Sequence, residues 1–180
     1  AEPWKRAPLP GQPRRGNPAA LALLTGTVMS RTAVQIAFST FLAFLLRERL
    51  PESGTNEAGV ALSAFWLANA IAGPTGGYLS DLVGRKTVMI GSLAVAPFVL
   101  FISLQLPGYW FVAGLSLGAF ILAMPHPANV VMATEFMPKS AGMAASMITG
   151  VAWGLGQFIA WPLGALAERT SLNFALGTVC

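Results

Sequence analysis

Long apolar runs separated by short polar segments form the main pattern of this chain. Each complete run is near or above the roughly 20 residues that an α-helix needs to cross the hydrocarbon core of a bilayer. A further run begins near Asn173 and stops at Cys180. The pattern predicts an all-α, polytopic transmembrane helix bundle of about five and a half spans, with the last span truncated. The complete runs cover residues 19–46, 58–79, 87–106, 109–134 and 142–166.

Composition agrees with a protein that lies in the lipid bilayer. Hydrophobic residues make up 54% of the chain and charged residues only 10%, whereas charged residues are about 25% of soluble domains. The 11 basic and 7 acidic residues include no basic face interleaved with aromatic residues, so nucleic acid is not an expected partner. A single cysteine excludes an intrachain disulfide and a cysteine-based metal site. The sequence has no phosphate-binding loop or dinucleotide fingerprint, so neither a cofactor nor a metal is expected.

The placement of basic residues predicts how the chain is oriented. Residues 1–17 are rich in proline and basic residues and contain no apolar run, which predicts a linker and not a cleavable signal peptide. This linker, Arg85, Lys86 and Lys139 hold seven of the eleven basic residues. Short loops rich in Lys and Arg stay in the cytoplasm, so these segments are predicted to be cytoplasmic. The opposite loops hold only Arg47, Arg49 and Arg169.

Residues 77–86 read Gly-Tyr-Leu-Ser-Asp-Leu-Val-Gly-Arg-Lys and separate the second and third runs. Gly77 is expected to let a helix end approach a neighbour, Asp81 to face the positive end of a helix dipole, and Gly84 to permit a tight turn. Arg85 and Lys86 suit a position near anionic headgroups. The decapeptide resembles the signature loop of the major facilitator superfamily, G-x-L-[SA]-D-x-x-G-R-[KR], at every specified position.

The resemblance implies a transporter with two six-span halves. The signature loop follows the second span of either half, as it does here, and the basic linker favours the second half. Residues 18–180 are therefore expected to be a C-terminal half that lacks its N-terminal six-span partner, and they are not expected to transport alone. The resemblance also implies a conformational latch that holds the cytoplasmic ends of neighbouring helices together in the outward-facing state. The expected latch residues are Gly77, Asp81, Gly84, Arg85 and Lys86.

Polar residues inside the runs are candidates for a pathway for substrate or protons. Arg31 lies near the middle of the first run, where an unpaired arginine costs on the order of 3 kcal/mol. It shares a helix face with Thr27, Gln35 and Ser39 and offers a planar fork to a phosphonate, phosphate or carboxylate. The alternative is a structural arginine that binds carbonyls at a kink or snorkels to the interface. The other candidates are Asn69, His126, Asn129 and Gln157, with Trp66 and Trp153 as further cavity residues or packing residues.

His126 is the only histidine and lies between Pro125 and Pro127. It is either a proton relay or a residue that hydrogen bonds hold within a kink. The segment 124–129 is similar to the His-Pro segment of the fosmidomycin-resistance branch of the superfamily. Residues 135–139 likewise resemble the acidic, proline-containing loop of that branch, which suggests drug efflux.

Small residues at four-residue spacing predict close helix packing. They form one stripe in the second run and two in the fifth. The third run has almost no polar side chain and is expected to face lipid. The stripes are Ala64, Ala68, Ala72 and Gly76, then Ser146, Gly150 and Gly154, and then Gly156, Ala160 and Gly164.

Enzymatic activity is not expected. Residues 114–118 match the G-x-S-x-G motif of serine hydrolases, but this motif requires a strand-to-helix turn and here it lies in a helical run. About 15 Å of helix would also separate Ser116 from His126. The expected function is proton-coupled export of small polar or amphipathic compounds across a bacterial inner membrane. Uptake of an organic anion or sugar, or a non-transporting receptor, are the alternatives.

Overall fold

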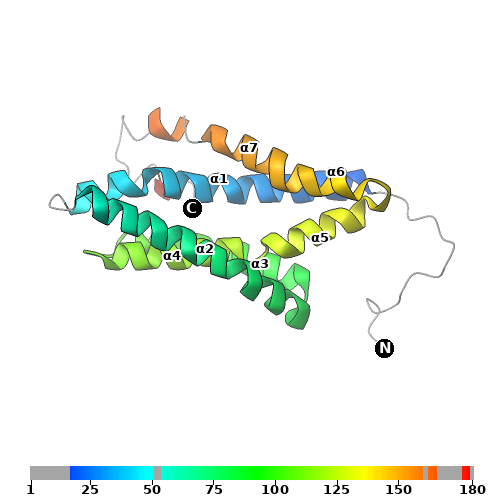
Figure 1. The fold of residues 1–180 in the computed structure, drawn as a ribbon, viewed down its shortest axis with the longest axis horizontal. Helices are drawn as coiled ribbons and strands as arrows, with labels where there is room; N and C mark the ends of the chain where they lie inside the picture. The colour runs from blue at the N-terminus through cyan, green and yellow to red at the C-terminus, as the bar shows by residue number, and fades with distance from the viewer. Residues whose placement is uncertain (1–16, 51–53, 160–161, 166–175, 179–180) are drawn as a thin grey trace.

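The computed structural model describes residues 17–50, 54–159, 162–165 and 176–178, and the regular elements in these ranges are all helical (Figure 1). The all-α fold class is therefore confirmed. Most of the predicted linker and of the sixth run lies outside the described residues. The long helices are α1 (Pro18–Arg49), α2 (Thr55–Val83), α3 (Arg85–Ser103), α4 (Trp110–Ala123) and α5 (His126–Phe136). The shorter elements are η2 (Pro138–Ser140), α6 (Ala141–Ser146), η3 (Met147–Val151), α7 (Ala152–Gly156) and η4 (Gln157–Ile159).

Four segments of the described chain are long and apolar enough to cross a membrane. They are α1, α2, α3 and the segment Trp110–Phe136, which joins α4 and α5. They coincide with the first four apolar runs. Beyond its first turn, helix α3 exposes a row of large apolar side chains, among them Val95, Phe98 and Ile102, which agrees with the expectation that this run faces lipid.

The fourth span is broken between α4 and α5. Pro125 and Pro127 lie at the break, where each lacks an amide hydrogen and its ring crowds the preceding turn. The kink expected at these prolines is therefore confirmed. Pro74 and Pro97 also lie inside spans, and α2 and α3 continue through them as single helices.

The fifth run is not one regular helix. It contains α6, a π-helical turn (η3), α7 and a 3-10 turn (η4). A π turn places its residues differently around the helix axis than an α turn, so four-residue spacing no longer follows one face. The first predicted stripe is exposed, so among the described residues it does not make the expected helix contact; it consists of Ser146, Gly150 and Gly154. The buried Gly156 instead packs against Thr32 and Ala33 of α1, and Gly164 lies near Phe41.

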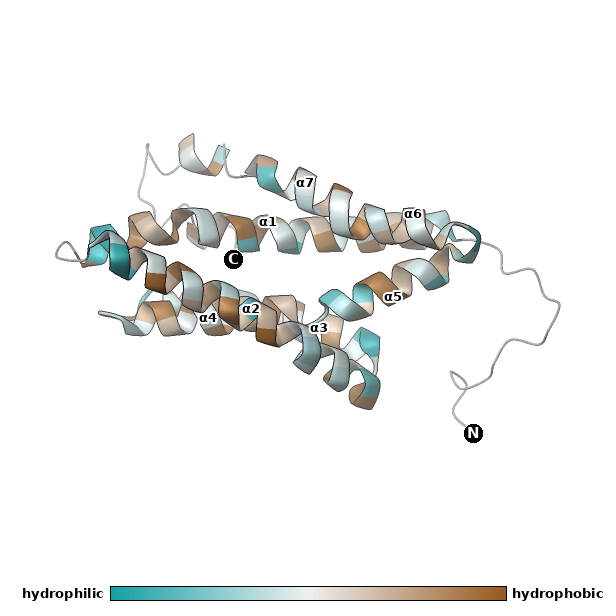
Figure 2. Cartoon of the chain, viewed as in Figure 1, coloured by the Kyte–Doolittle hydropathy of each residue, from teal (hydrophilic) through white to brown (hydrophobic). Residues whose placement is uncertain are grey.

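Helix packing leaves two hydrophobic clusters. Helices α2 and α3 both pack on α4, while α1 packs on α2 and α7. One cluster surrounds Phe38, Phe65 and Phe111, and the other surrounds Val28 and Ile148. Along α1, the segment that carries Arg31 and Gln35 lies between the two. Figure 2 shows hydrophilic residues where α5 begins, close to the middle of the bundle.

Candidate functional site

Arg31 lies in the middle of α1 and is only 5% exposed. Its Nη1 atom is fully buried and has no hydrogen-bond partner. Within the part of the chain that the structure describes, the guanidinium forms no hydrogen bond or ion pair, so the carbonyl contacts of the structural alternative are not seen there. A buried, unpaired charge is costly, and its planar donor fork suits an anion.

The other polar residues on this face of α1 have partners. Gln35 Nε2 donates to Asn69 Oδ1 at 2.5 Å, and Asn69 Nδ2 donates to the Phe65 carbonyl at 3.0 Å. The Thr27 and Ser39 hydroxyls donate to carbonyls of their own helix. Gln35 and Asn69 therefore connect α1 to α2, which leaves Arg31 as the residue of this face whose polar group is available for a ligand.

His126 and Asn129 lie on the first turn of α5, directly after the proline break. The His126 ring meets the Trp153 ring edge to face, with centroids 6.5 Å apart. Helix α5 also packs on α1, the helix that carries Arg31. Asn129 is 1% exposed, and its Oδ1 has no hydrogen-bond partner. A buried donor on α1 and a buried acceptor on α5 thus both lack partners, which is the state expected of groups that bind a ligand or water.

Two tryptophans complete this group of side chains. The Trp66 ring of α2 stacks on the Trp153 ring of α7, with centroids 6.5 Å apart and planes at 27°. These ring contacts bring α2, α5 and α7 together, and α1, which carries Arg31, packs on all three helices. Gln157 does not join this group of side chains, because it lies exposed in η4.

The signature segment, residues 77–86, is helical on both sides of a single residue. Residues 77–83 belong to α2, and Arg85 already opens α3, so the loop expected from the sequence is a one-residue turn. Gly84 makes this turn with φ 93°, a conformation that favours glycine, and its expected role is confirmed. The expected close approach at Gly77 is wrong among the described residues, because a Cβ there would meet no atom within 4 Å.

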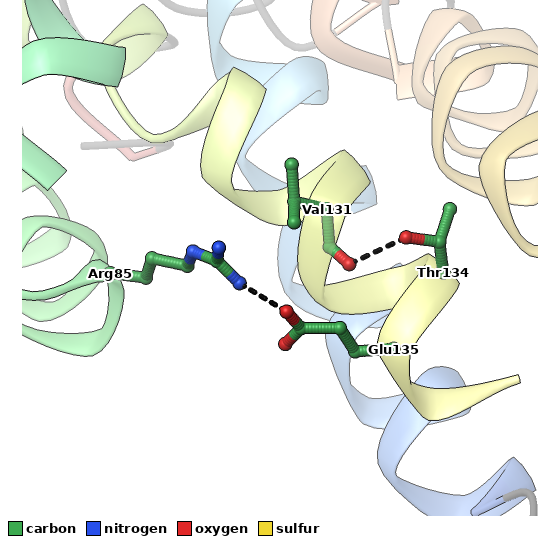
Figure 3. A network of polar contacts seen from close by, with 4 residues as sticks. All are labelled: Arg85, Val131, Thr134 and Glu135. Carbon is green, nitrogen blue, oxygen red and sulfur yellow. Dashed lines mark hydrogen bonds and ion pairs between the residues drawn. The ribbon is translucent and has the colours of Figure 1, made fainter. Parts of the chain in front are cut away.

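Arg85 and Glu135 form an ion pair of 2.7 Å (Figure 3). Arg85 lies at the positive end of α3 and Glu135 at the negative end of α5, where each charge alone is unfavourable. Pairing offsets both effects. The two side chains are 35% and 53% exposed, so the pair stabilises the fold by about 0–1 kcal/mol. Neither Asp81 nor Lys86 has a side-chain partner among the described residues.

A second arginine contact lies at the opposite end of the bundle. Arg49, in the last turn of α1, donates from Nη1 to the Leu106 carbonyl at 2.9 Å and from Nη2 to the Leu104 carbonyl. Its guanidinium also lies over the Phe111 ring, 5.1 Å from the centroid. Arg49 thereby connects α1 to the α3–α4 junction. From the sequence, Arg49 indicated only the topology, and this contact was not predicted.

Comparison with known proteins supports the assignment of the chain to a family. Residues 20–176 match the Major Facilitator Superfamily model. The Fosmidomycin resistance protein of Escherichia coli (strain K12) is 34% identical over 162 residues, which cover 89% of this chain and 39% of that protein. The uncharacterized MFS-type transporter YfnC of Bacillus subtilis (strain 168) is 32% identical over 110 residues, or 61% of this chain and 27% of that protein.

No solved structure gives a significant match. The chain spans less than half the length of both relatives. The family consists of transporters, which agrees with the expectation that the chain is not an enzyme. The family match and the four apolar helices together identify the chain as an integral, multi-pass membrane protein that belongs to the major facilitator superfamily.

Proposed function

We propose that this chain is the C-terminal half of a secondary active transporter that exports small anionic compounds from a bacterial cell by alternating access. The observation that carries this proposal is the buried, unpaired guanidinium of Arg31 in the middle of a membrane span. The family match and the name of the Escherichia coli relative support export in a bacterial inner membrane.

Arg31 is the proposed anion-binding group. Its fork gives two parallel hydrogen bonds to a phosphonate, phosphate or carboxylate. Asn129 Oδ1, also buried and unpaired, accepts a hydrogen bond from a hydroxyl or N–H group of the same substrate. The Gln35–Asn69 hydrogen bond connects α1 to α2, which supports the position of the Arg31 helix before substrate binds.

His126 is the proposed link to protons. It is the one histidine of the chain, and it lies on α5, which packs on the helix that carries Arg31. A proton on the imidazole changes the local charge that an anion meets, so proton binding and substrate binding are coupled at this site.

The signature segment is the proposed conformational latch. Asp81, Gly84, Lys86 and the Arg85–Glu135 pair lie together at one end of the bundle. Contacts that exist in only one state shift the equilibrium toward that state. We assign these contacts to the outward-facing state, with this end of the bundle in the cytoplasm.

The test is Arg31→Lys in the full-length transporter reconstituted in proteoliposomes. Lysine keeps the charge but loses the fork, so the Kd for fosmidomycin should rise about tenfold or more, with some residual transport. Arg47→Lys, at an exposed position in the last turn of α1, is the matched control and should leave Kd unchanged. If Arg31 instead pairs with a carboxylate of the other half, Arg31→Lys will lower Tm without changing Kd, and the anion-site proposal is then rejected.

A further inference from the structure

We propose that Trp153 positions the imidazole ring of His126 for proton transfer, and that Trp66 acts one step further away by holding the Trp153 ring. The inference rests on the proposed function, because it takes His126 as the link to protons. It assigns a role to two side chains that do not titrate themselves.

The backbone of His126 is restricted on both sides. Pro125 and Pro127 flank it, and the ring of each proline fixes its own φ angle. His126 also opens α5, so its backbone belongs to a regular helix. The side-chain torsions χ1 and χ2 are therefore the main freedom that the imidazole keeps, and the contacts of the ring select among their rotamers.

Within the described part of the chain, an aromatic contact holds this ring and no hydrogen bond does. The imidazole meets the Trp153 ring edge to face, with centroids 6.5 Å apart and planes at 80°. A hydrogen bond to one ring nitrogen would fix the tautomer and occupy that nitrogen. Packing on an indole orients the ring and leaves both nitrogens available to take up or release a proton, which a relay requires.

The place of Trp153 depends on the irregular fifth run. Trp153 is the second residue after the π turn η3, and the extra residue of a π turn rotates the helix that follows by about 100°. Trp66 of α2 stacks on the Trp153 ring, with planes at 27°. The Trp66 ring also meets the buried Phe65 ring at 5.9 Å. These contacts connect Trp153, and through it His126, to the hydrophobic cluster around Phe65.

The charges around His126 show what else could change its proton exchange. Residues 141–156, which form α6, η3 and α7, include no titratable side chain. Helix α1 carries Arg31 in its middle. The other titratable groups of α5 and of the elements that pack on it lie toward helix ends, within residues 47–49, 57, 78–86 and 135–139. Arg31 is therefore the group whose contribution must be separated from that of Trp153, and the Kd for an anion makes this separation.

The experiment measures fosmidomycin transport by the full-length transporter in proteoliposomes, driven by an imposed pH gradient or run as counterflow. Trp153→Leu removes the indole and should lower the driven rate about two- to tenfold, while counterflow and the fosmidomycin Kd stay unchanged. Trp153→Phe keeps an aromatic ring and should keep most of the driven rate. Trp110→Leu, at the start of α4 and 72% exposed, is the matched control and should change neither rate.

A double-mutant cycle tests whether Trp153 acts through the histidine. In a His126→Gln background, Trp153→Leu should lower the driven rate no further. Trp66→Leu should lower the driven rate of the parental protein by a smaller factor, and it should have no effect in a Trp153→Leu background. Because Trp66 is 38% exposed, Trp66→Leu leaves no closed cavity and keeps the test open if Trp153→Leu does not fold.

The remaining outcomes separate this inference from the proposed function. If Trp153→Leu lowers the driven rate and counterflow equally, or acts equally in both backgrounds, Trp153 is a packing residue and the inference is rejected. If His126→Gln lowers the driven rate but neither tryptophan variant does, the inference fails and the proposed proton link stands. If His126→Gln leaves the driven rate unchanged, the proposed proton link fails as well.

Discussion

Gly76 of α2 and Met124, at the break between α4 and α5, are in direct backbone contact. A Cβ atom at position 76 would lie 1.9 Å from the Met124 carbonyl oxygen. This contact places α2 directly against the break that precedes His126. The geometry of the candidate site therefore depends on the absence of a side chain at Gly76.

Gly76→Ala should destabilise the protein, because the added methyl group forces α2 away from backbone atoms that cannot rotate aside. Such overpacking costs about 1–3 kcal/mol or more, and we expect a lower Tm in detergent by scanning fluorimetry. Gly73→Ala is the control, because a Cβ at position 73 meets no atom within 4 Å, and alanine favours the helix by about 1 kcal/mol. Equal Tm values for the two variants would contradict the contact.

Charge reversal tests the Arg85–Glu135 pair. Arg85→Glu or Glu135→Arg alone creates a like-charge pair and should reduce the transport rate. The double variant restores attraction and also places each charge at the favourable end of its helix dipole, so transport should recover. The measurement is initial rate in proteoliposomes, with the substrate Kd measured in parallel.

Lys86→Glu provides the comparison for charge reversal, since Lys86 is exposed and has no side-chain partner among the described residues. It should change the rate less than Arg85→Glu does. If the double variant transports as slowly as the single variants, the Arg85–Glu135 pair is not part of the proposed latch.

Membrane orientation can be tested by cysteine labelling after Cys180→Ser. The charge count places Gly54 outside the cell and Lys86 in the cytoplasm, and both positions are exposed. An impermeant maleimide should therefore label Gly54→Cys in intact cells and Lys86→Cys only after permeabilisation. Ser80 is unsuitable for this measurement because it is only 5% exposed. If only Lys86→Cys is labelled in intact cells, the predicted membrane orientation is wrong.

His126→Gln tests proton coupling. Glutamine keeps hydrogen-bonding groups but does not titrate near neutral pH. The pH dependence of transport should become flatter, whereas counterflow, which needs no net proton movement, should continue. Asn129→Asp is not a suitable control, because it adds a titratable group, so Gln157→Asn at the exposed η4 position is used instead. An unchanged pH profile in His126→Gln would assign the histidine to a structural role.

The first three spans could be predicted from the sequence because hydropathy and length alone define them. The break at Pro125 could also be predicted, since proline acts locally. The fifth run could not, because a π turn such as Met147–Val151 depends on tertiary packing and leaves no pattern in hydropathy. For the same reason, the four-residue spacing of small residues around Gly150 did not predict which face of this run packs on α1.

The candidate site was predictable in its residue types but not in its pairings. Arg31 and His126 were evident as rare ionisable groups inside apolar runs. The sequence did not reveal which polar residues satisfy one another, so Gln35 and Asn69 appeared as site residues although they bind each other. Glu135 and Arg49 were missed as contact residues because their partners lie on other helices.

The contacts of Arg49 and Arg85 give the two ends of the bundle different responses to the surrounding solution. Arg85 binds an exposed carboxylate, so dissolved ions screen the attraction. The Leu104 and Leu106 carbonyls that accept hydrogen bonds from Arg49 carry no net charge. High ionic strength therefore weakens the attraction between Arg85 and Glu135 more than it weakens the hydrogen bonds from Arg49 to these carbonyls.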